Sequence, residues 1–217
     1  MKLALIGATG FVGSHLLKEA LRREHIVTAV VRDPKKVHIE EHNLIVKQGN
    51  ALNPDELCTL IKGNDVLVSA YNPGWHNPKL YAEFLEGSRA IQQACKLAGI
   101  KRLIVVGGAG SLEITPGEQL VDSPYFPDEW KEGALAARDY LDELRLEKEL
   151  DWVFLSPAIE MHPGTSGIRT GNYRTGNDQP VFNKDNESKI SVEDLAVALL
   201  DEVENSRFHQ QRFTVAW

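Results

Sequence analysis

The residues best suited to chemistry in this sequence are three glycines near its start. Gly7, Gly10 and Gly13 stand three residues apart, after the apolar run 2–6 and at the start of an amphipathic segment. Glycine tolerates the positive φ of a tight turn, and the missing side chains let a phosphate approach main-chain N–H groups. Unpaired N–H groups and the helix dipole favour an anion at a helix start. A strand, a GxxGxxG turn and a helix in this order therefore predict a dinucleotide site, with Gly10 and Gly13 the positions least tolerant of a side chain. The alternative is a glycine-rich turn that binds no ligand.

The rest of the chain alternates apolar strands with helical segments. β-Branched and apolar runs predict strands at 25–31, 44–46, 65–70, 101–106, 152–155 and 212–215. Helices are expected from Pro54, with Asn53 as the N-cap, at 79–98, at about 130–150, and after the N-cap Ser191. Helical crossovers between apolar strands indicate a parallel sheet covered on both faces. We therefore predict one α/β domain over 1–217, a doubly wound, mainly parallel sheet of Rossmann type.

Two connections are longer than those usual in such folds. They run over 107–128 and over 156–190, and both leave the C-terminal ends of strands, where open α/β sheets bind ligands. The second is predicted to be a small substrate-side cap, although both could be mere decoration of the fold. The expected substrate pocket lies between 70–75, 107–125 and 156–169.

Composition limits the classes of partner. The chain has 217 residues, a formal net charge of −7 and no stripe of Lys and Arg, so nucleic acid is not an expected partner. No apolar run approaches the length of a membrane span, and the first one is too short for a signal peptide. Cys58 and Cys95 lack metal-ligand spacing, so we expect free thiols and a cytoplasmic protein. We expect a monomer or a homodimer.

Four motifs carry a family resemblance over the whole chain. They are GATGFVG at 7–13, VVRDPKK at 30–36, QGNALNP at 48–54 and LSPA at 155–158. With them the chain resembles the atypical short-chain dehydrogenase/reductase superfamily. Within it, the chain is most similar to the NmrA-like group of NADPH-dependent flavin reductases and biliverdin-IXβ reductase. It also looks like bacterial members called NAD-dependent epimerase/dehydratase or NADH-flavin reductase. The resemblance implies cofactor contacts from the turn, namely Gly7, Thr9, Gly10, Phe11, Val12 and Gly13.

The second motif bears on the choice of cofactor. NAD-preferring sites place an acidic residue at the end of the second strand, where this chain has Val31, followed by Arg32. A guanidinium there can clamp a 2′-phosphate, so the sequence predicts NADP(H) in preference to NAD(H). Asp33 leaves an alternative open, because its carboxylate could take the ribose hydroxyl instead; Arg32 could also be a solvated loop residue.

The resemblance also implies further contacts with the cofactor. It places Asn50 at the adenine edge and Ala70, with Tyr71 after it, against the adenosine and ribose.

The catalytic residues are less well defined. Standard members of the superfamily use Tyr-x-x-x-Lys, but Tyr140 and Tyr125 are followed four residues later by Leu144 and Glu129. An alcohol–ketone mechanism therefore lacks its acid–base pair, whereas hydride transfer to a flavin needs none, because water can protonate the reduced ring. Ser111 resembles in position the serine of flavin-reducing relatives, which implies an orienting role. Tyr71, Trp75 and Tyr125 could stack on a planar ring, and Tyr125 is the candidate acid–base residue should the chemistry resemble carbonyl reduction.

Three functions follow from these observations. The leading one is an NAD(P)H-dependent oxidoreductase that reduces a flavin, a quinone or a similar planar acceptor. The second is a non-catalytic regulator that senses NADP(H). The third, an NAD-dependent epimerase or dehydratase acting on a sugar nucleotide, is disfavoured because the Tyr-x-x-x-Lys pair is missing.

Overall fold

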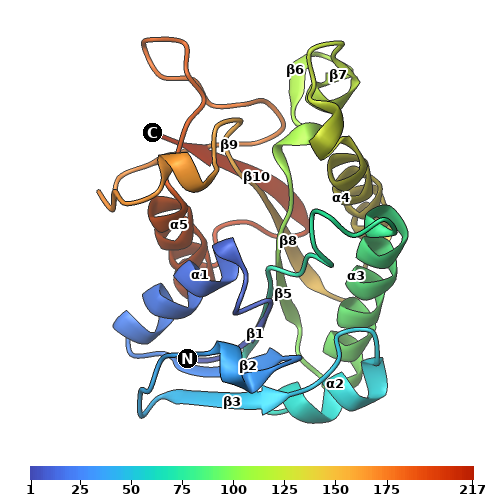
Figure 1. Cartoon of the computed structure of the whole chain (residues 1–217), viewed down its shortest axis with the longest axis vertical. Helices are drawn as coiled ribbons and strands as arrows, with labels where there is room; N and C mark the ends of the chain where they lie inside the picture. Colours follow the sequence, from blue (N-terminus) through green and yellow to red (C-terminus); the bar gives the residue numbers. More distant parts are fainter.

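A central sheet of eight strands organises the chain. The computed structural model describes residues 1–217 and orders the sheet β3-β2-β1-β4-β5-β8-β10-β9 (Figure 1). The strands are β1 Lys2–Ile6, β2 Ile26–Val31, β3 Leu44–Gln48, β4 Val66–Ser69, β5 Arg102–Val106, β8 Asp151–Ser156, β9 Arg174–Gly176 and β10 Gln211–Ala216. Every neighbouring pair is parallel except β9 and β10, which are antiparallel. The predicted doubly wound, mainly parallel sheet is confirmed.

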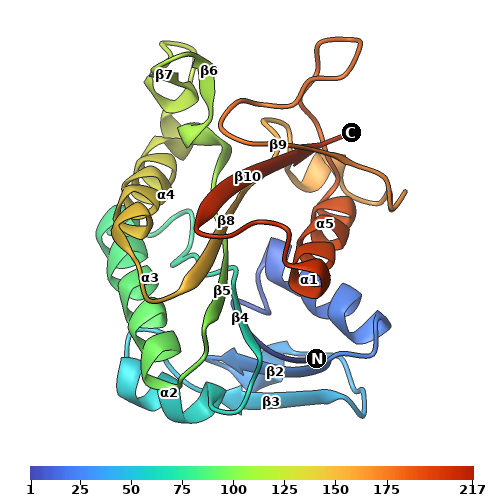
Figure 2. The ribbon, with the colours of Figure 1, turned by 180° about the vertical axis from the view of Figure 1, so that it is seen from behind.

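Helices cover both faces of the sheet. They are α1 Phe11–Arg22, α2 Pro54–Ile61, α3 Leu80–Leu97, α4 Asp128–Leu146 and α5 Val192–Asn205. Figures 1 and 2 show α1 and α5 on one face, and α2, α3 and α4 on the other. Each face has its own buried apolar cluster, as expected for strands whose two sides are both withdrawn from water. No helix is long and apolar enough to cross a membrane.

Local signals in the sequence explain where the helices begin and end. The Asn53 side chain accepts a hydrogen bond from the N–H of Glu56, and Ser191 does the same for Asp194 at the start of α5. The fourth helix ends at Leu146, earlier than the predicted 150. Glu147 takes an extended conformation there, and its carboxylate accepts the N–H of Glu149 at 2.6 Å, which turns the chain toward β8.

The order of the strands reverses at β1. From β1 the chain moves outward to β2 and β3, then returns to place β4 on the other side of β1. The crossover connections therefore diverge at the C-terminal ends of β1 and β4, which leaves a crevice of the kind where open α/β sheets bind ligands. The glycine turn follows β1 at this point.

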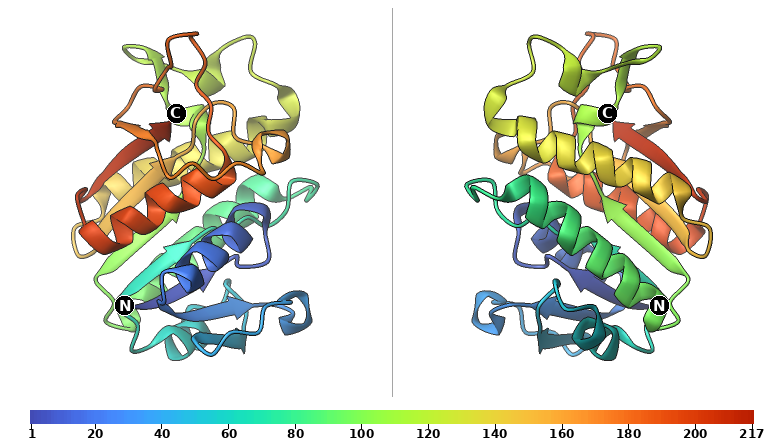
Figure 3. Two further views of the ribbon diagram at one scale, coloured as in Figure 1. Left: turned by 90° about the vertical axis from the view of Figure 1, so that its left-hand side faces the viewer. Right: turned by 90° about the vertical axis from the view of Figure 1, so that its right-hand side faces the viewer.

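The two long connections lie at the same end of the molecule, as both views in Figure 3 show. Residues 107–127 form the short helix η2 Ala109–Ser111, the hairpin of β6 Glu113–Thr115 and β7 Glu118–Gln119, and the helix η3 Leu120–Asp122. The 156–190 segment holds the helix η4 Pro163–Thr165 and strand β9. Strand β9 was not predicted, because Arg-Thr-Gly has no apolar alternation; pairing with the edge of β10 creates it.

Candidate functional site

The glycine turn is held by two close approaches of the main chain. Gly7 has φ +84°, and a Cβ on it would lie 2.3 Å from the carbonyl oxygen of Ala70 at the end of β4. A Cβ on Gly13 would lie 2.0 Å from the carbonyl oxygen of Gly7. Neither position has room for a side chain, because each glycine packs main chain against main chain. The intolerance predicted for Gly13 thus has a packing cause, and Gly7 shares it.

Gly10 differs from the other two glycines. Its φ is −80°, and a Cβ there would meet only the Gly7 carbonyl oxygen, at 3.4 Å, so packing does not require glycine at this position. Gly10 donates its N–H to Gly7 at 2.9 Å, and its carbonyl accepts the N–H of Ser14. The N–H groups of Phe11, Val12 and Gly13 have no acceptor within the chain. A set of free donors at a helix start fits the phosphates of a dinucleotide.

Arg32 lies at the adjacent end of β2. It is exposed, and its guanidinium makes no hydrogen bond or ion pair within the chain. Asp33 is engaged, since its carboxylate accepts the N–H of Lys35 at 3.1 Å and caps η1 Pro34–Lys36. Burial raises the pKa of Tyr71, and the positive charge of Arg32 opposes that rise.

The remaining predicted cofactor residues follow β3 and β4. Asn50 is exposed and accepts the N–H of Leu52 with its side-chain oxygen, at 3.1 Å. Ala70 is half-buried beside Gly7. Tyr71 turns toward α3, where its hydroxyl donates to the Glu83 carbonyl at 3.2 Å and its ring covers Gly87. The structure therefore gives Tyr71 a packing contact with α3. The exposed Thr9 adds a hydroxyl to the turn.

Ser111 is buried, and both of its oxygens are engaged within the fold. Ser111 is 2 % exposed. Its hydroxyl and carbonyl oxygens both accept hydrogen bonds from Nη1 of Arg212, at 3.0 and 2.7 Å. Arg212 also donates through Nε to Asp178 at 3.0 Å. The buried guanidinium thus joins η2, β10 and the 156–190 segment. The Ser111 hydroxyl is therefore held by Arg212, and the orienting role that the resemblance implies for Ser111 stays a prediction.

Tyr125 is also separate from Ser111. Its side chain is 92 % exposed on the loop before α4, and its hydroxyl has no partner within the chain. Helix α4 instead packs small residues toward the loop after β5. A Cβ on Gly110 would lie 2.7 Å from Cβ of Ala134, and one on Gly108 would lie 3.7 Å from Cβ of Ala137. The structure brings no acid–base pair to this face of α4.

Comparisons with known proteins agree with this geometry. Residues 7–205 match the family described as NAD(P)H-binding. The chain belongs to the NAD(P)H-binding family. It is 37% identical over 217 residues to the uncharacterized protein YwnB of Bacillus subtilis, covering 99% of this chain and 98% of that one.

Two solved structures are also similar. A "putative epimerase" from Bacteroides thetaiotaomicron is 46% identical, covers 100% of this chain and 96% of its own, and has a TM-score of 0.92. A "putative NADH-flavin reductase" from Streptococcus pneumoniae is 35% identical, covers 100% and 99%, and has a TM-score of 0.85. The resemblance to atypical short-chain dehydrogenases/reductases is confirmed.

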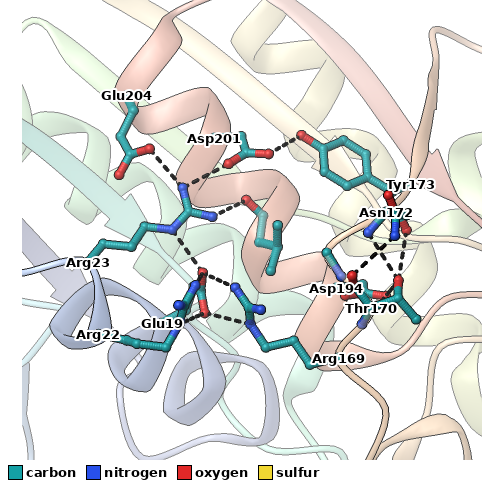
Figure 4. Close-up of polar contacts among 12 residues, drawn as sticks. Glu19, Arg22, Arg23, Arg169, Thr170, Asn172, Tyr173, Asp194, Asp201 and Glu204 are labelled. Atoms are coloured by element: carbon teal, nitrogen blue, oxygen red, sulfur yellow. Dashed lines mark hydrogen bonds and ion pairs between the residues drawn. The ribbon is translucent and has the colours of Figure 1, made fainter.

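The 156–190 segment of this NAD(P)H-binding protein is fastened to α1 and α5 by charged groups (Figure 4). The buried carboxylate of Glu19 on α1 accepts hydrogen bonds from Arg22, from Arg23 and, at 3.0 Å, from Nη2 of Arg169 in the 156–190 segment. Arg23 also binds Asp201 of α5 at 2.8 Å. Burial alone would raise the pKa of Glu19, but the bonds from the three arginines lower it to about 2.

A second buried carboxylate fixes the same segment to the start of α5. Asp194, fully buried, accepts the hydroxyl of Thr170, the N–H of Gly171 at 2.8 Å and the indole N–H of Trp217 at 2.7 Å. The neighbouring Glu193 accepts the N–H of Gly167 and lies 3.6 Å from the imidazole of His15, one turn into α1. The predicted cap is thus tied to the helix that carries the nucleotide turn.

Sequence reasoning missed several of these residues. Arg212 had a signal, since a charged residue in an apolar strand that is covered on both faces needs a buried partner. Glu19 offered a weaker one, because it lies among the apolar residues of the α1 stripe. Asp178 and Asp194 had no such signal, since their partners come from distant segments. Trp130 had no signal beyond its place at the start of a predicted helix.

Proposed function

We propose that this chain is an NADPH-dependent reductase that passes a hydride to a planar conjugated acceptor, a flavin or a quinone. The observation that carries the proposal is the face of α4 beside the loop after β5. The α4 side chains that face this loop are Ala134 and Ala137, which carry no proton donor, and the chain has no Tyr-x-x-x-Lys pair. Reduction of a carbonyl needs a positioned proton donor, whereas a conjugated ring that accepts hydride takes its proton from water. The name of the Streptococcus pneumoniae relative supports this class of acceptor.

The chain's own residues bind and orient. The free N–H groups of Phe11, Val12 and Gly13 would hold the pyrophosphate, and Ala70 would lie against the adenosine and ribose. Bound NADPH would supply a hydride (two electrons and one proton), and water would supply the second proton that turns a quinone into a hydroquinone. Catalysis would come from holding two rings at near-attack distance, which can lower a barrier by several kcal/mol.

Arg32 is the basis for NADPH over NADH. Its guanidinium has no partner within the chain, whereas the competing Asp33 carboxylate already caps η1. A charge-assisted bond to a 2′-phosphate is worth roughly 1.5–3 kcal/mol, and exposure to solvent favours the lower end of that range. NADPH should therefore bind about tenfold more tightly than NADH. Arg32→Ala should remove most of this gap and leave NADH binding nearly unchanged, as measured by calorimetric titration. Equal affinities for NADPH and NADH in the unmodified protein would contradict the role of Arg32 and indicate that Asp33 contacts the ribose instead.

The activity itself can be tested with the purified protein. NADPH oxidation would be followed with riboflavin and with menadione, and formation of NADPH from NADP⁺ would be followed with a panel of secondary alcohols. We expect slow, stoichiometric reduction of riboflavin or menadione and no alcohol oxidation. Tyr125→Phe serves as the control for acid–base chemistry and should retain most of the rate, because Tyr125 is exposed and unpartnered. Loss of turnover in that variant would instead indicate a carbonyl reductase.

Two other functions are outcomes of the same experiments. Tight NADPH binding with no acceptor reduced would favour a protein that senses NADP(H). The name of the Bacteroides thetaiotaomicron relative suggests an epimerase, and that function would require the protein to interconvert sugar nucleotides with bound cofactor. That reaction needs a proton donor and acceptor at the sugar carbon, and the α4 face provides none.

A further inference from the structure

Two tryptophans form an exposed pair at the substrate end of the sheet. Trp75 lies on the loop between β4 and α3, and Trp130 lies in the first turn of α4. Their ring centroids are 5.1 Å apart and their planes meet at 62°. Trp75 is 50 % exposed and Trp130 39 %, whereas Trp152 in the sheet is 2 % exposed. Since core packing withdraws large aromatic rings from water, this pair needs a different explanation.

The fold holds Trp75 in place. A Cβ on Gly133 of α4 would lie 2.6 Å from Cζ3 of the Trp75 indole, so the ring rests on the glycine surface of the helix. The loop that carries Trp75 is fixed as well. Asn72 accepts the N–H of Gly74 at 2.7 Å, and Asn77 donates to the Glu83 carboxylate at 2.7 Å. The indole is therefore preorganised, which lowers the entropy cost of binding a ligand to it.

The two tryptophans lie on segments near the C-terminal ends of β4 and β5. Trp75 follows Ala70 by five residues, and the Ala70 carbonyl lies against Gly7 of the nucleotide turn. Trp130 precedes Ala134 by one helical turn, and Ala134 packs on Gly110 of the loop after β5. Both indoles thus belong to segments that leave or border the C-terminal ends of β4 and β5, the edge at which an open α/β sheet binds its ligands.

We propose that Trp75 and Trp130 form the stacking site for the ring of the hydride acceptor, an electron-poor conjugated ring such as an oxidised flavin. The proposal rests on the proposed function and names the part of the site that takes the acceptor. An electron-rich indole face attracts an electron-poor ring, and two indoles in an edge-to-face arrangement offer a corner in which a ring on one face meets the edge of the other. Gly133 is part of the site because it seats Trp75.

The test uses riboflavin as the acceptor and measures its KM and the NADPH dissociation constant separately. Trp75→Ala and Trp130→Ala should each raise the riboflavin KM about tenfold, the effect of losing one aromatic stack. NADPH affinity should stay within about twofold of the unmodified value. Trp75→Phe should recover most of the KM, because it keeps a stacking face. Leu146→Ala is the matched control: it removes an exposed apolar side chain from the far end of α4 and should change neither constant.

A second measurement does not depend on turnover. Riboflavin should quench the fluorescence of the NADP⁺-bound protein at lower concentrations than it quenches Trp75→Ala. If riboflavin is reduced but both alanine variants keep the original KM and quenching curve, the stacking site is refuted while the reductase stands. If no acceptor is reduced, the reductase proposal fails and the quenching curves alone decide the stacking site. A dimer of the unmodified protein that becomes a monomer in Trp75→Ala, seen by sedimentation, would assign the pair to a contact between copies and overturn the proposal.

Discussion

Glu19→Gln is the substitution that best tests how the 156–190 segment is held. The buried Glu19 carboxylate accepts bonds from Arg22, Arg23 and Arg169, of which only Arg169 belongs to the 156–190 segment. Glutamine keeps the size and one acceptor oxygen but removes the negative charge that three guanidinium groups share. The variant should fold, with the segment more weakly attached to α1.

The magnitude follows from the pKa of Glu19, which is lowered from 4.5 to about 2 in the folded chain. A pKa lowered on folding stabilises the protein fully above the unfolded value of 4.5, and this stabilisation is lost as the pH falls through 2. The gap corresponds to roughly 3 kcal/mol at pH 7, of which about 2 kcal/mol is lost by pH 3. The variant carries no such group, so its deficit relative to the unmodified protein should shrink by about 2 kcal/mol over that range.

Urea unfolding followed by circular dichroism, in steps from pH 7 to pH 3, measures this difference. Glu40→Gln is the control, because Glu40 is exposed and makes no side-chain hydrogen bond or ion pair; its unfolding free energy should follow that of the unmodified protein at every pH. A Glu19→Gln deficit that stays constant between pH 7 and pH 3 would show that the arginines do not lower the pKa of Glu19. The account of how the segment is fastened would then be wrong.

Three further predictions concern the turn and one helix cap. Gly10→Val should leave the fold intact, because Gly10 has an ordinary φ and a Cβ there makes only a van der Waals contact with the Gly7 carbonyl; it should nevertheless abolish NADPH binding in a titration. Gly13→Ala should lower the unfolding free energy, because its Cβ would lie 2.0 Å from the Gly7 carbonyl oxygen. Normal NADPH binding by folded Gly10→Val would mean that the turn does not receive the phosphates. Asn53→Ala should lower the unfolding free energy by about 1 kcal/mol, because it removes the side chain that accepts the Glu56 N–H. In a thermal scan the melting temperature should fall by roughly 2–4 °C. An unchanged melting temperature would mean that this bond is not formed in solution.

The parts of the fold that follow local rules could be predicted from the sequence. The glycine turn, the Asn53 and Ser191 caps and the alternation of strands and helices are each encoded within a few neighbouring residues, and the structure has them where they were expected. The doubly wound sheet follows from that alternation because crossovers between parallel strands are right-handed. Strand β9 has no such local signal; its partner on β10 is about forty residues away.

The substrate side was harder to predict for the same reason. Ser111 looked like a residue lining the site because it follows β5 closely, but its environment is set by Arg212, a hundred residues later. Tyr125 was chosen for its chemistry, and only the structure shows it exposed on an unpaired loop. Trp75 gains its partner Trp130 and its seat Gly133 through the packing of a loop on α4, which no spacing in the sequence reveals.

The contrast between the turn and position 32 bears on how this chain can diverge over evolutionary time. Gly7 and Gly13 are fixed by main-chain contacts, so a substitution at either is selected against for folding before any ligand is involved. Arg32 is exposed and its guanidinium has no partner within the chain, so its replacement should have little effect on folding. Descendants of this sequence should therefore keep glycine at positions 7 and 13 for folding alone, whereas selection at position 32 depends on what that side chain binds.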